Sequence, residues 1–143
     1  MKILLIGNPN VGKSVVFNRL TGVDVISSNY PGTTIDYTKG YITLDGVRHE
    51  LIDVPGTYTL EPLSKAEKIP VELLKQGDII INVIDATNLE RSLNLTLQLI
   101  KQRKPMIIIL NMFDETKHIG VSIDVKKLEE ILSFNKRTFY FLK

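Results

Sequence analysis

Short apolar runs alternate with longer segments of mixed polar and apolar residues along this chain of 143 residues. Runs rich in Ile, Leu and Val are typical of buried strands, whereas apolar residues spaced three and four apart indicate helices. Five segments are predicted to be strands: residues 2–6, 37–44, 48–53, 78–85 and 105–111. Four segments are predicted to be helices: residues 13–21, about 64–75, 89–103 and 125–132. The alternation predicts an α/β fold with a mixed, mostly parallel sheet flanked by helices.

Local signals add one hairpin and one apolar helix face to this prediction. Asp45-Gly46 separates the second and third predicted strands and is a hairpin turn signal, so one antiparallel pair should interrupt the parallel set. In the third predicted helix, Leu93, Leu97 and Ile100 repeat at helical spacing. We expect these three side chains to form its apolar face.

Two segments fit no regular element. Residues 23–36 and 54–70 each combine Pro and Gly with several Thr or Ser, and we expect loops there. Asp124 precedes the fourth predicted helix and is expected to cap it. In sheets of this type ligands bind beyond the strand ends, which is where both loops would lie.

Composition narrows the class of protein. With 43% hydrophobic residues, the chain is long enough for one core and is expected to form one domain. Its 18 basic and 16 acidic residues leave a formal charge of +2, which gives no nucleic-acid footprint. The absence of Cys excludes disulfides and thiolate metal sites and is compatible with the cytoplasm. The apolar runs are shorter than the roughly 18 residues that span a bilayer.

The stretch GNPNVGKS, residues 7–14, lies between the first predicted strand and the first predicted helix. In that context G-x-x-x-x-G-K-S is a phosphate-binding loop. Gly7 and Gly12 allow backbone N–H groups to approach an anion, Lys13 supplies a charge, and the Ser14 hydroxyl can bind Mg²⁺. The alternative is a glycine-rich turn that ends a strand, and the flanking elements favour the phosphate loop.

Two further motifs follow predicted strands. In the sequence DVPG, Asp53 can hold Mg²⁺ through water and the N–H of Gly56 can meet a terminal phosphate. In the sequence NMFD, Asp114 can accept hydrogen bonds from the ring N–H and the amine of guanine, whereas adenine would present a lone pair to it. Asn111 would tie this loop to the phosphate loop. The alternatives are an ordinary turn and an Asn/Asp loop cap.

Together, five segments resemble the N-terminal GTPase domain of the bacterial and archaeal ferrous iron transport protein B: GNPNVGKS, NYPGTT, DVPGTYTL, NVIDATNLERSLNLTLQL and NMFDETKHIGVSIDVKKLEEIL. The likeness covers about residues 2–132. The short motifs alone would indicate only a GTPase of the translation-factor-like class, whereas the last two segments are more particular to the family. The resemblance implies a P-loop NTPase (Ras-like) G domain that binds GTP and GDP with Mg²⁺ and slowly hydrolyses GTP to GDP and phosphate.

The resemblance also implies a role for each matching residue. The nucleotide-binding set would be Asn10, Val11, Gly12, Lys13, Ser14, Val15, Gly32, Thr33, Thr34, Asp53, Gly56, Asn111, Met112 and Asp114. Catalysis would involve Asn10, Lys13, Thr34 and Gly56. The metal-binding set would be Ser14, Thr34 and Asp53 for Mg²⁺, with Asn10 as a candidate for K⁺. Thr34, in the first switch (residues 23–36), would complete the Mg²⁺ shell when GTP is bound.

Several positions depart from the common GTPase pattern. Met112 stands where many GTPases have Lys and still offers apolar cover for the base. Thr57 stands where a glutamine would orient the attacking water, and residues 23–36 contain no Arg or Lys to act as an arginine finger. The remaining candidate is Asn10, which could help to bind K⁺ as in the potassium-activated GTPases that this loop resembles. The alternative is that Asn10 only hydrogen-bonds within the loop.

The C-terminus departs further. After Leu132 the family pattern would continue with a strand, a loop that supports the guanine carbonyl and a final helix, but the chain reads SFNKRTFYFLK. TFYFL could supply a last strand. We therefore expect a GTP-binding domain over residues 1–132 and an atypical tail over residues 133–143, with the C-terminal strand and helix truncated or atypical.

The family's partners follow from the resemblance. They would be a helical regulatory domain and a membrane channel domain of the same chain, which would place this domain at the cytoplasmic face of the cell membrane; a homo-oligomer is a further candidate, and nucleic acid is not expected. One alternative is a stand-alone ribosome- or RNA-associated GTPase, because P-G-T-T switches also occur there, although the near-neutral charge and the lack of a basic module argue against it. Another is a non-catalytic guanine-nucleotide-binding module.

Overall fold

The apolar run KILLIG forms β1 (Lys2–Gly7), which lies in the middle of a seven-stranded sheet. The computed structural model describes residues 1–22, 25–65, 67–132 and 141–142. Five of the six residues of β1 are buried, because helices cover both faces of the central strands. The other described strands are β2 (Val25–Asn29), β3 (Asp36–Leu44), β4 (Val47–Asp53), β5 (Ile79–Asp85), β6 (Met106–Asn111) and β7 (Phe141–Leu142).

The strand order is β2-β3-β4-β1-β5-β6-β7. Strands β4, β1, β5, β6 and β7 run parallel, whereas β3 is antiparallel to both β2 and β4. The predicted turn at Asp45-Gly46 joins β3 to β4, and both residues have the positive φ, 51° and 76°, that a tight hairpin needs. The predicted fold class, a mixed and mostly parallel sheet flanked by helices, is confirmed.

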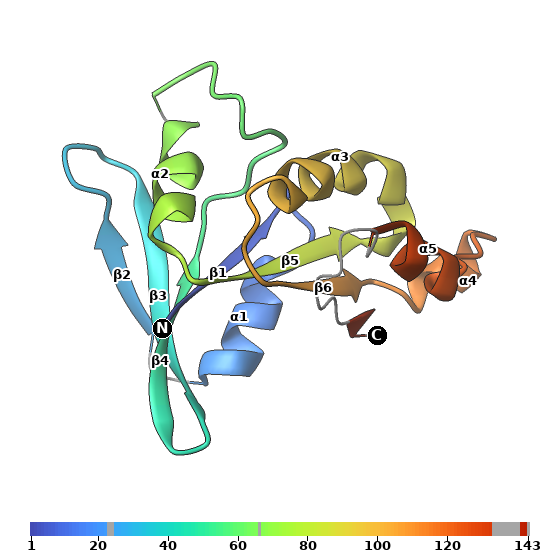
Figure 1. Cartoon of the computed structure of the whole chain (residues 1–143), viewed down its shortest axis with the longest axis horizontal. Coiled ribbons are helices and arrows are strands. Elements are labelled where there is room, and N and C mark those ends of the chain that lie inside the picture. The colour runs from blue at the N-terminus through green and yellow to red at the C-terminus, as the bar shows by residue number, and fades with distance from the viewer. Residues whose placement is uncertain (23–24, 66, 133–140, 143) are drawn as a thin grey trace.

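Helices lie on both faces of the sheet (Figure 1). The described helices are α1 (Lys13–Thr21), α2 (Lys68–Gln76), α3 (Leu89–Ile100), α4 (Glu115–His118), α5 (Val125–Leu132) and the 3-10 turn η1 (Ala86–Asn88). One core cluster joins the strands to α2, α3 and α5, and a second joins the opposite face to α1 through Phe17. No described helix has the length and apolar character needed to cross a bilayer.

The predicted apolar face of α3 is wrong at one position. Leu97 is 52% exposed, whereas Leu95 and Leu99 are buried in the core. The buried stripe also contains a polar residue, because the Thr96 hydroxyl donates a 2.7 Å hydrogen bond to the side chain of Asn82 on β5. A stripe that includes a buried hydroxyl is not visible in a pattern of apolar residues alone.

Element boundaries also differ from the prediction. Residues 23–36 were expected to lack regular structure, but β2 lies within them and pairs with β3. The helix expected from about residue 64 begins at Lys68. The Ser64 hydroxyl accepts a 3.2 Å hydrogen bond from the Glu67 N–H in the turn that precedes α2. Asp124 caps α5 as predicted, through a 3.0 Å bond from the Lys127 N–H.

The last strand of the sheet comes from the C-terminal tail. In β7, Phe141 and Leu142 pair in parallel with Ile108 and Ile109 of β6. The other residues of the segment TFYFL lie outside the described part of the chain. The division into a domain over residues 1–132 and a tail over residues 133–143 stays a prediction.

Candidate functional site

The loop between β1 and α1 has the conformation that its sequence predicts. Asn10 and Gly12 adopt positive φ values of 64° and 85°, so the chain turns sharply before α1 begins at Lys13. A Cβ atom at Gly12 would collide with the side-chain amide of Asn111, and one at Gly7 would lie 2.5 Å from the carbonyl oxygen of Val83. Both glycines are therefore required for close packing of this loop against the neighbouring strands.

Lys13 and Asp53 face each other where β1 and β4 end. The Lys13 Nζ lies 4.0 Å from the Asp53 Oδ1, and the two side chains are only 11% and 16% exposed. Burial lowers the pKa of Lys13 below its usual value of 10.5, and the charge of Asp53 partly offsets that shift. Burial raises the pKa of Asp53 above 3.8, while Lys13 and a hydrogen bond from Ser14 oppose the rise.

These opposite shifts indicate what would complete the site. Each buried charge is only partly compensated by the other, so an anion beside Lys13 and a cation beside Asp53 would both be stabilised. The Asp53 Oδ1 is buried and has no hydrogen-bond partner among the described residues. A carboxylate oxygen in that state, next to the hydroxyl of Ser14, is a suitable donor set for a hard cation such as Mg²⁺.

The DVPG segment packs directly on the phosphate loop. The N–H of Val54 donates to Leu5 O at 3.0 Å and the N–H of Thr57 donates to Gly7 O at 3.3 Å. Gly56 lies against Pro9, whose backbone would be 3.0 Å from a Cβ at that position. The structure therefore brings Gly56 to the phosphate loop, as its predicted role requires.

The hydroxyl of Thr57 is not available to orient a water molecule. The Thr57 Oγ1 donates a 2.8 Å hydrogen bond to the carbonyl oxygen of Thr59, and Thr57 is 5% exposed. A buried hydroxyl that is already committed within its own turn does not replace the missing glutamine.

Helix α3 holds the same segment through residues that the sequence analysis missed. The Gln98 Oε1 accepts hydrogen bonds from the Leu60 N–H at 2.6 Å and from the Thr59 hydroxyl at 3.2 Å. The Arg91 guanidinium stacks on the ring of Tyr58 at 4.2 Å. These residues carry no motif, and only the packing of α3 beside residues 57–60 reveals them.

The NMFD loop at the end of β6 lies beside the phosphate loop. As predicted, Asn111 ties the two together: its Nδ2 donates a 2.9 Å hydrogen bond to the carbonyl oxygen of Val11. Met112 has a positive φ of 57°, and its methyl group lies near Gly12. Asp114 is exposed where α4 begins.

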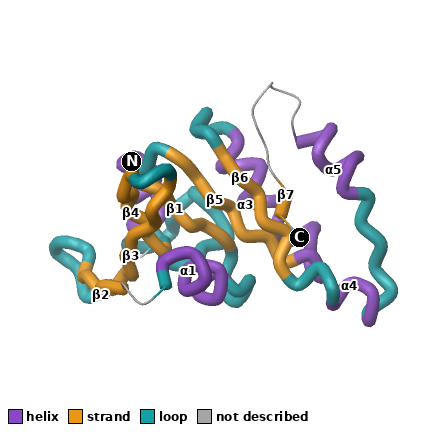
Figure 2. Tube along the Cα trace, turned by 90° about the horizontal axis from the view of Figure 1, so that it is seen from below, coloured by secondary structure: helices purple, strands orange, loops and turns teal. Residues whose placement is uncertain are grey.

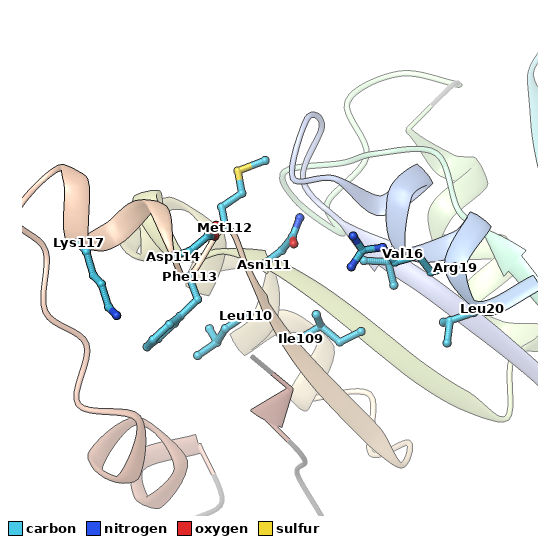
Figure 3. A pocket seen from close by; sticks show the side chains of 10 residues that line it. All are labelled: Val16, Arg19, Leu20, Ile109, Leu110, Asn111, Met112, Phe113, Asp114 and Lys117. Carbon is cyan, nitrogen blue, oxygen red and sulfur yellow. The ribbon is translucent and has the colours of Figure 1, made fainter.

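A cavity of about 720 Å³ opens between α1 and this loop. Figure 3 shows its lining, which comes from two segments that are distant in sequence. The lining residues are Val16, Arg19, Leu20, Ile109, Leu110, Asn111, Met112, Phe113, Asp114 and Lys117. The cavity adjoins the phosphate loop and is large enough for a purine base.

Three predicted residues of the first switch, Gly32, Thr33 and Thr34, are not brought to the site. They lie in the loop that joins β2 to β3, where Thr34 is exposed and Gly32 has a φ of 76°. Thr33 closes that loop on itself, because its hydroxyl donates to Tyr30 O at 3.0 Å and accepts from the Ile35 N–H at 3.2 Å. Figures 1 and 2 both place this hairpin end at the edge of the molecule, away from the loop that precedes α1.

Comparisons of sequence identify relatives of known class. A model of the family described as ferrous iron transport protein B matches residues 1–137. The Fe(2+) transporter FeoB of Legionella pneumophila (strain Lens) is 44% identical over 135 residues, which cover 90% of this chain and 18% of the transporter. The Fe(2+) transporter FeoB of Campylobacter jejuni is 42% identical over 132 residues, which cover 91% and 22%. The chain thus spans about a fifth of the length of these relatives.

Solved structures agree with this assignment. The cytosolic domain of L. pneumophila FeoB matches with a TM-score of 0.89 and 41% identity over 100% of this chain and 61% of that one. The G domain of T. maritima FeoB matches with a TM-score of 0.85 and 36% identity, over 99% of this chain and 86% of that one. A mutant of S. thermophilus NFeoB bound to GDP matches with a TM-score of 0.86 and 38% identity, over 99% of this chain and 55% of that one. The predicted P-loop GTPase fold is confirmed.

Proposed function

The chain belongs to the ferrous iron transport protein B family, and we propose that it is the GTP-binding and GTP-hydrolysing switch domain of a ferrous iron transporter. The observation that carries this proposal is the 2.9 Å hydrogen bond from Asn111 to Val11. It holds the NMFD loop, which would bind guanine, against the phosphate loop. The GDP bound by the S. thermophilus relative supports the same ligand class.

The phosphates would bind where α1 begins. Lys13 is a largely buried cation at the end of the phosphate loop, and a phosphate beside it would stabilise its charged form. Asn10, Val11 and Gly12 lie in the same loop, and Val15 lies in the first turn of α1. Ser14 and Asp53 would hold Mg²⁺, with Thr34 joining them in the triphosphate state. When bound, that ion would neutralise charge on the phosphate oxygens.

The base would bind in the cavity between α1 and the NMFD loop. The Asp114 carboxylate lines that cavity and would accept from the ring N–H and the amine of guanine. Met112, which also lines it, would cover the base with its apolar side chain. Adenine would place a lone pair against Asp114, so the site would reject it.

Hydrolysis would depend on groups other than an arginine finger and a glutamine. Thr57 is buried and its hydroxyl is committed to Thr59, which leaves Asn10 as the candidate. Asn10 is exposed in the middle of the phosphate loop, where its side-chain oxygen could join phosphate oxygens around K⁺. Gly56 and the first-switch residues Gly32, Thr33 and Thr34 would respond to the terminal phosphate.

Transport itself would belong to the rest of the longer chain that the relatives have. Because this chain spans about a fifth of those transporters, coupling to a helical regulatory domain and a membrane channel domain is part of the proposal. The domain would then work at the cytoplasmic face of the membrane, where its conformation would report whether GTP or GDP is bound.

Calorimetric titration of the protein with GTP, GDP and ATP, with and without Mg²⁺, tests this function. We expect guanine nucleotides to bind and ATP to bind much more weakly, and we expect Mg²⁺ to strengthen GTP binding. Asp114→Asn should reduce the preference for guanine by roughly ten- to a hundredfold. Release of phosphate from GTP, followed over hours, separates a slow enzyme from a non-catalytic binding module. Equal affinity for ATP and GTP would overturn the assignment.

A further inference from the structure

Asn8, the second residue of the phosphate loop, belongs to none of the binding roles proposed above. Its side chain is buried, with the residue only 4% exposed, so its amide has to find its hydrogen-bond partners within the protein. The Asn8 Nδ2 donates a 3.3 Å hydrogen bond to the carbonyl oxygen of Arg91 on α3. The Asn8 Oδ1 is buried and has no hydrogen-bond partner among the described residues. A buried oxygen in that state costs free energy, and a donor brought to it would recover that cost.

The contact with α3 fixes the orientation of the Asn8 amide. The group that faces the Arg91 carbonyl oxygen has to be the NH₂, because two oxygens at 3.3 Å would repel each other. Turning the amide over would therefore satisfy neither of its ends. The open acceptor of Asn8 needs a donor from a different segment.

The segment that packs on the phosphate loop has two open donors. Among residues 54–60, the N–H groups that donate to a described partner are those of Val54, Thr57, Thr59 and Leu60. The N–H groups of Gly56 and Tyr58 have no partner in the part of the chain that the structure describes. The Gly56 N–H is the group proposed to meet the terminal phosphate. The Tyr58 N–H is left as a donor for another acceptor.

Two contacts bring Tyr58 and Asn8 to the same place. The Thr57 N–H donates to Gly7 O at 3.3 Å, and Tyr58 and Asn8 are the residues that follow this bond on each side. Arg91 contacts both of them, because its carbonyl accepts from Asn8 and its guanidinium lies 4.2 Å from the centre of the Tyr58 ring. The open acceptor and the open donor therefore lie between the same two contacts.

We propose that the Asn8 Oδ1 accepts a hydrogen bond from the Tyr58 N–H when a triphosphate is bound, and that this bond is open otherwise. Gly56 would turn its N–H to the terminal phosphate, and Tyr58, two residues further along, would move with it. In the structure Thr34 lies away from the phosphate loop, which is the arrangement expected without a terminal phosphate, and the bond is open.

Asn8 would thus be a positioning residue that does not touch the nucleotide. It would stabilise the form of residues 56–60 in which Gly56 contacts the terminal phosphate. This role rests on the proposed function, because it requires a triphosphate in the site, and it adds a residue to the response of that site.

Amide hydrogen exchange measured by NMR tests the bond directly. The Tyr58 N–H should exchange roughly tenfold more slowly in the Mg²⁺ complex with GMPPNP, a GTP analogue that is not hydrolysed, than in the GDP complex. In Asn8→Ala this difference should disappear, because the acceptor is gone. The Thr57 N–H, which is already bonded to Gly7 O, is the internal control and should exchange slowly in both complexes.

Nucleotide affinities should show the same selectivity. Asn8→Ala should weaken GMPPNP binding roughly three- to tenfold, the effect of one hydrogen bond. GDP binding should change by less than about twofold, because the Asn8 bond to Arg91 does not reach the nucleotide. A purely structural role for Asn8 would instead weaken the binding of both nucleotides by the same factor, and that result would overturn the proposal.

Arg91→Ala is the matched variant. It removes the stack on Tyr58 and keeps the backbone carbonyl to which Asn8 donates, so the difference in Tyr58 exchange between the two complexes should persist. If Arg91→Ala removes that difference, the Arg91 side chain positions the segment and the proposal is wrong. Equal Tyr58 exchange in the two wild-type complexes would also overturn it. Failure of the wild type to bind GDP and GMPPNP would count against the proposed function instead, so the two failures are distinguishable.

Discussion

The side-chain amide of Asn111 donates a 2.9 Å hydrogen bond to the backbone carbonyl of Val11, 100 residues earlier in the chain. The bond joins the end of β6 to the phosphate loop that follows β1, although β5 lies between the two strands. A ligand that spans the two loops therefore meets them at a set spacing. This is the preorganisation that a nucleotide site needs.

Asn111→Ala should weaken binding of GTP and GDP by a similar factor. The variant loses the bond to Val11, worth about 0.5–1.5 kcal/mol, so affinity should fall roughly three- to tenfold for both nucleotides. Calorimetry measures this change, with Asn94→Ala on the exposed side of α3 as the matched control. A loss of affinity for only one of the two nucleotides would show that the bond does not support the GTP and GDP states equally.

The affinity for GTP should fall as the pH rises through the lowered pKa of Lys13. In the protein without nucleotide, burial lowers the pKa of Lys13 below its usual value of 10.5, and a bound phosphate would raise it again. Between these two pKa values Lys13 is neutral in the free protein and charged in the complex, so binding takes up a proton. The affinity therefore falls as the pH rises. Titrations between about pH 8 and 10 measure the slope. Lys13→Ala should bind weakly and with a smaller slope, and an identical slope would exclude Lys13 as the titrating group.

Thr34→Ala should slow hydrolysis of GTP and spare the affinity for GDP. Thr34 is exposed at the end of the β2–β3 hairpin, away from the phosphate loop, and it would reach the metal only in the triphosphate state. Single-turnover phosphate release and GDP titration are the two measurements. If Thr34→Ala lowers the hydrolysis rate and the GDP affinity equally, Thr34 contributes to both nucleotide states and the prediction is wrong.

Turnover of GTP should be faster in K⁺ than in Na⁺ at equal ionic strength. Residues 23–36 contain no Arg or Lys that could place a positive charge beside the phosphates. A cation held by Asn10 would supply that charge instead. Asn10→Ala should abolish the acceleration without abolishing nucleotide binding. The same rate in both salts, in protein shown to bind GTP, would contradict this prediction.

Gln98→Ala should release residues 59 and 60 from α3. The variant loses bonds of 2.6 and 3.2 Å, and the free energy of unfolding should fall by about 1–2 kcal/mol. Because residues 57–60 continue from Gly56, GTP turnover should also fall while GDP affinity stays. Urea denaturation and phosphate release measure the two effects, and Gln102→Ala, exposed just beyond α3, is the control.

Sequence patterns predicted helix positions more securely than helix orientation. The spacing of Leu93, Leu97 and Ile100 identified α3, but Leu97 is exposed and the buried stripe contains Leu95 and Thr96. Thr96 is buried because Asn82 on β5 requires a hydrogen-bond partner. Strand β2 was missed because its residues are mostly exposed, so they carry no alternating apolar pattern.

The sequence by itself determined the features whose chemistry is local. The phosphate loop, the Asp45-Gly46 hairpin and the Asp124 cap each depend on a few adjacent residues with a strong conformational preference, so short motifs identified them. The tertiary structure decided which distant groups meet. Strand order places Asn111 against Val11, and the packing of α3 places Gln98 against Leu60 and Arg91 against Asn8. Those pairings depend on how the sheet is assembled, and no local preference of either partner encodes them.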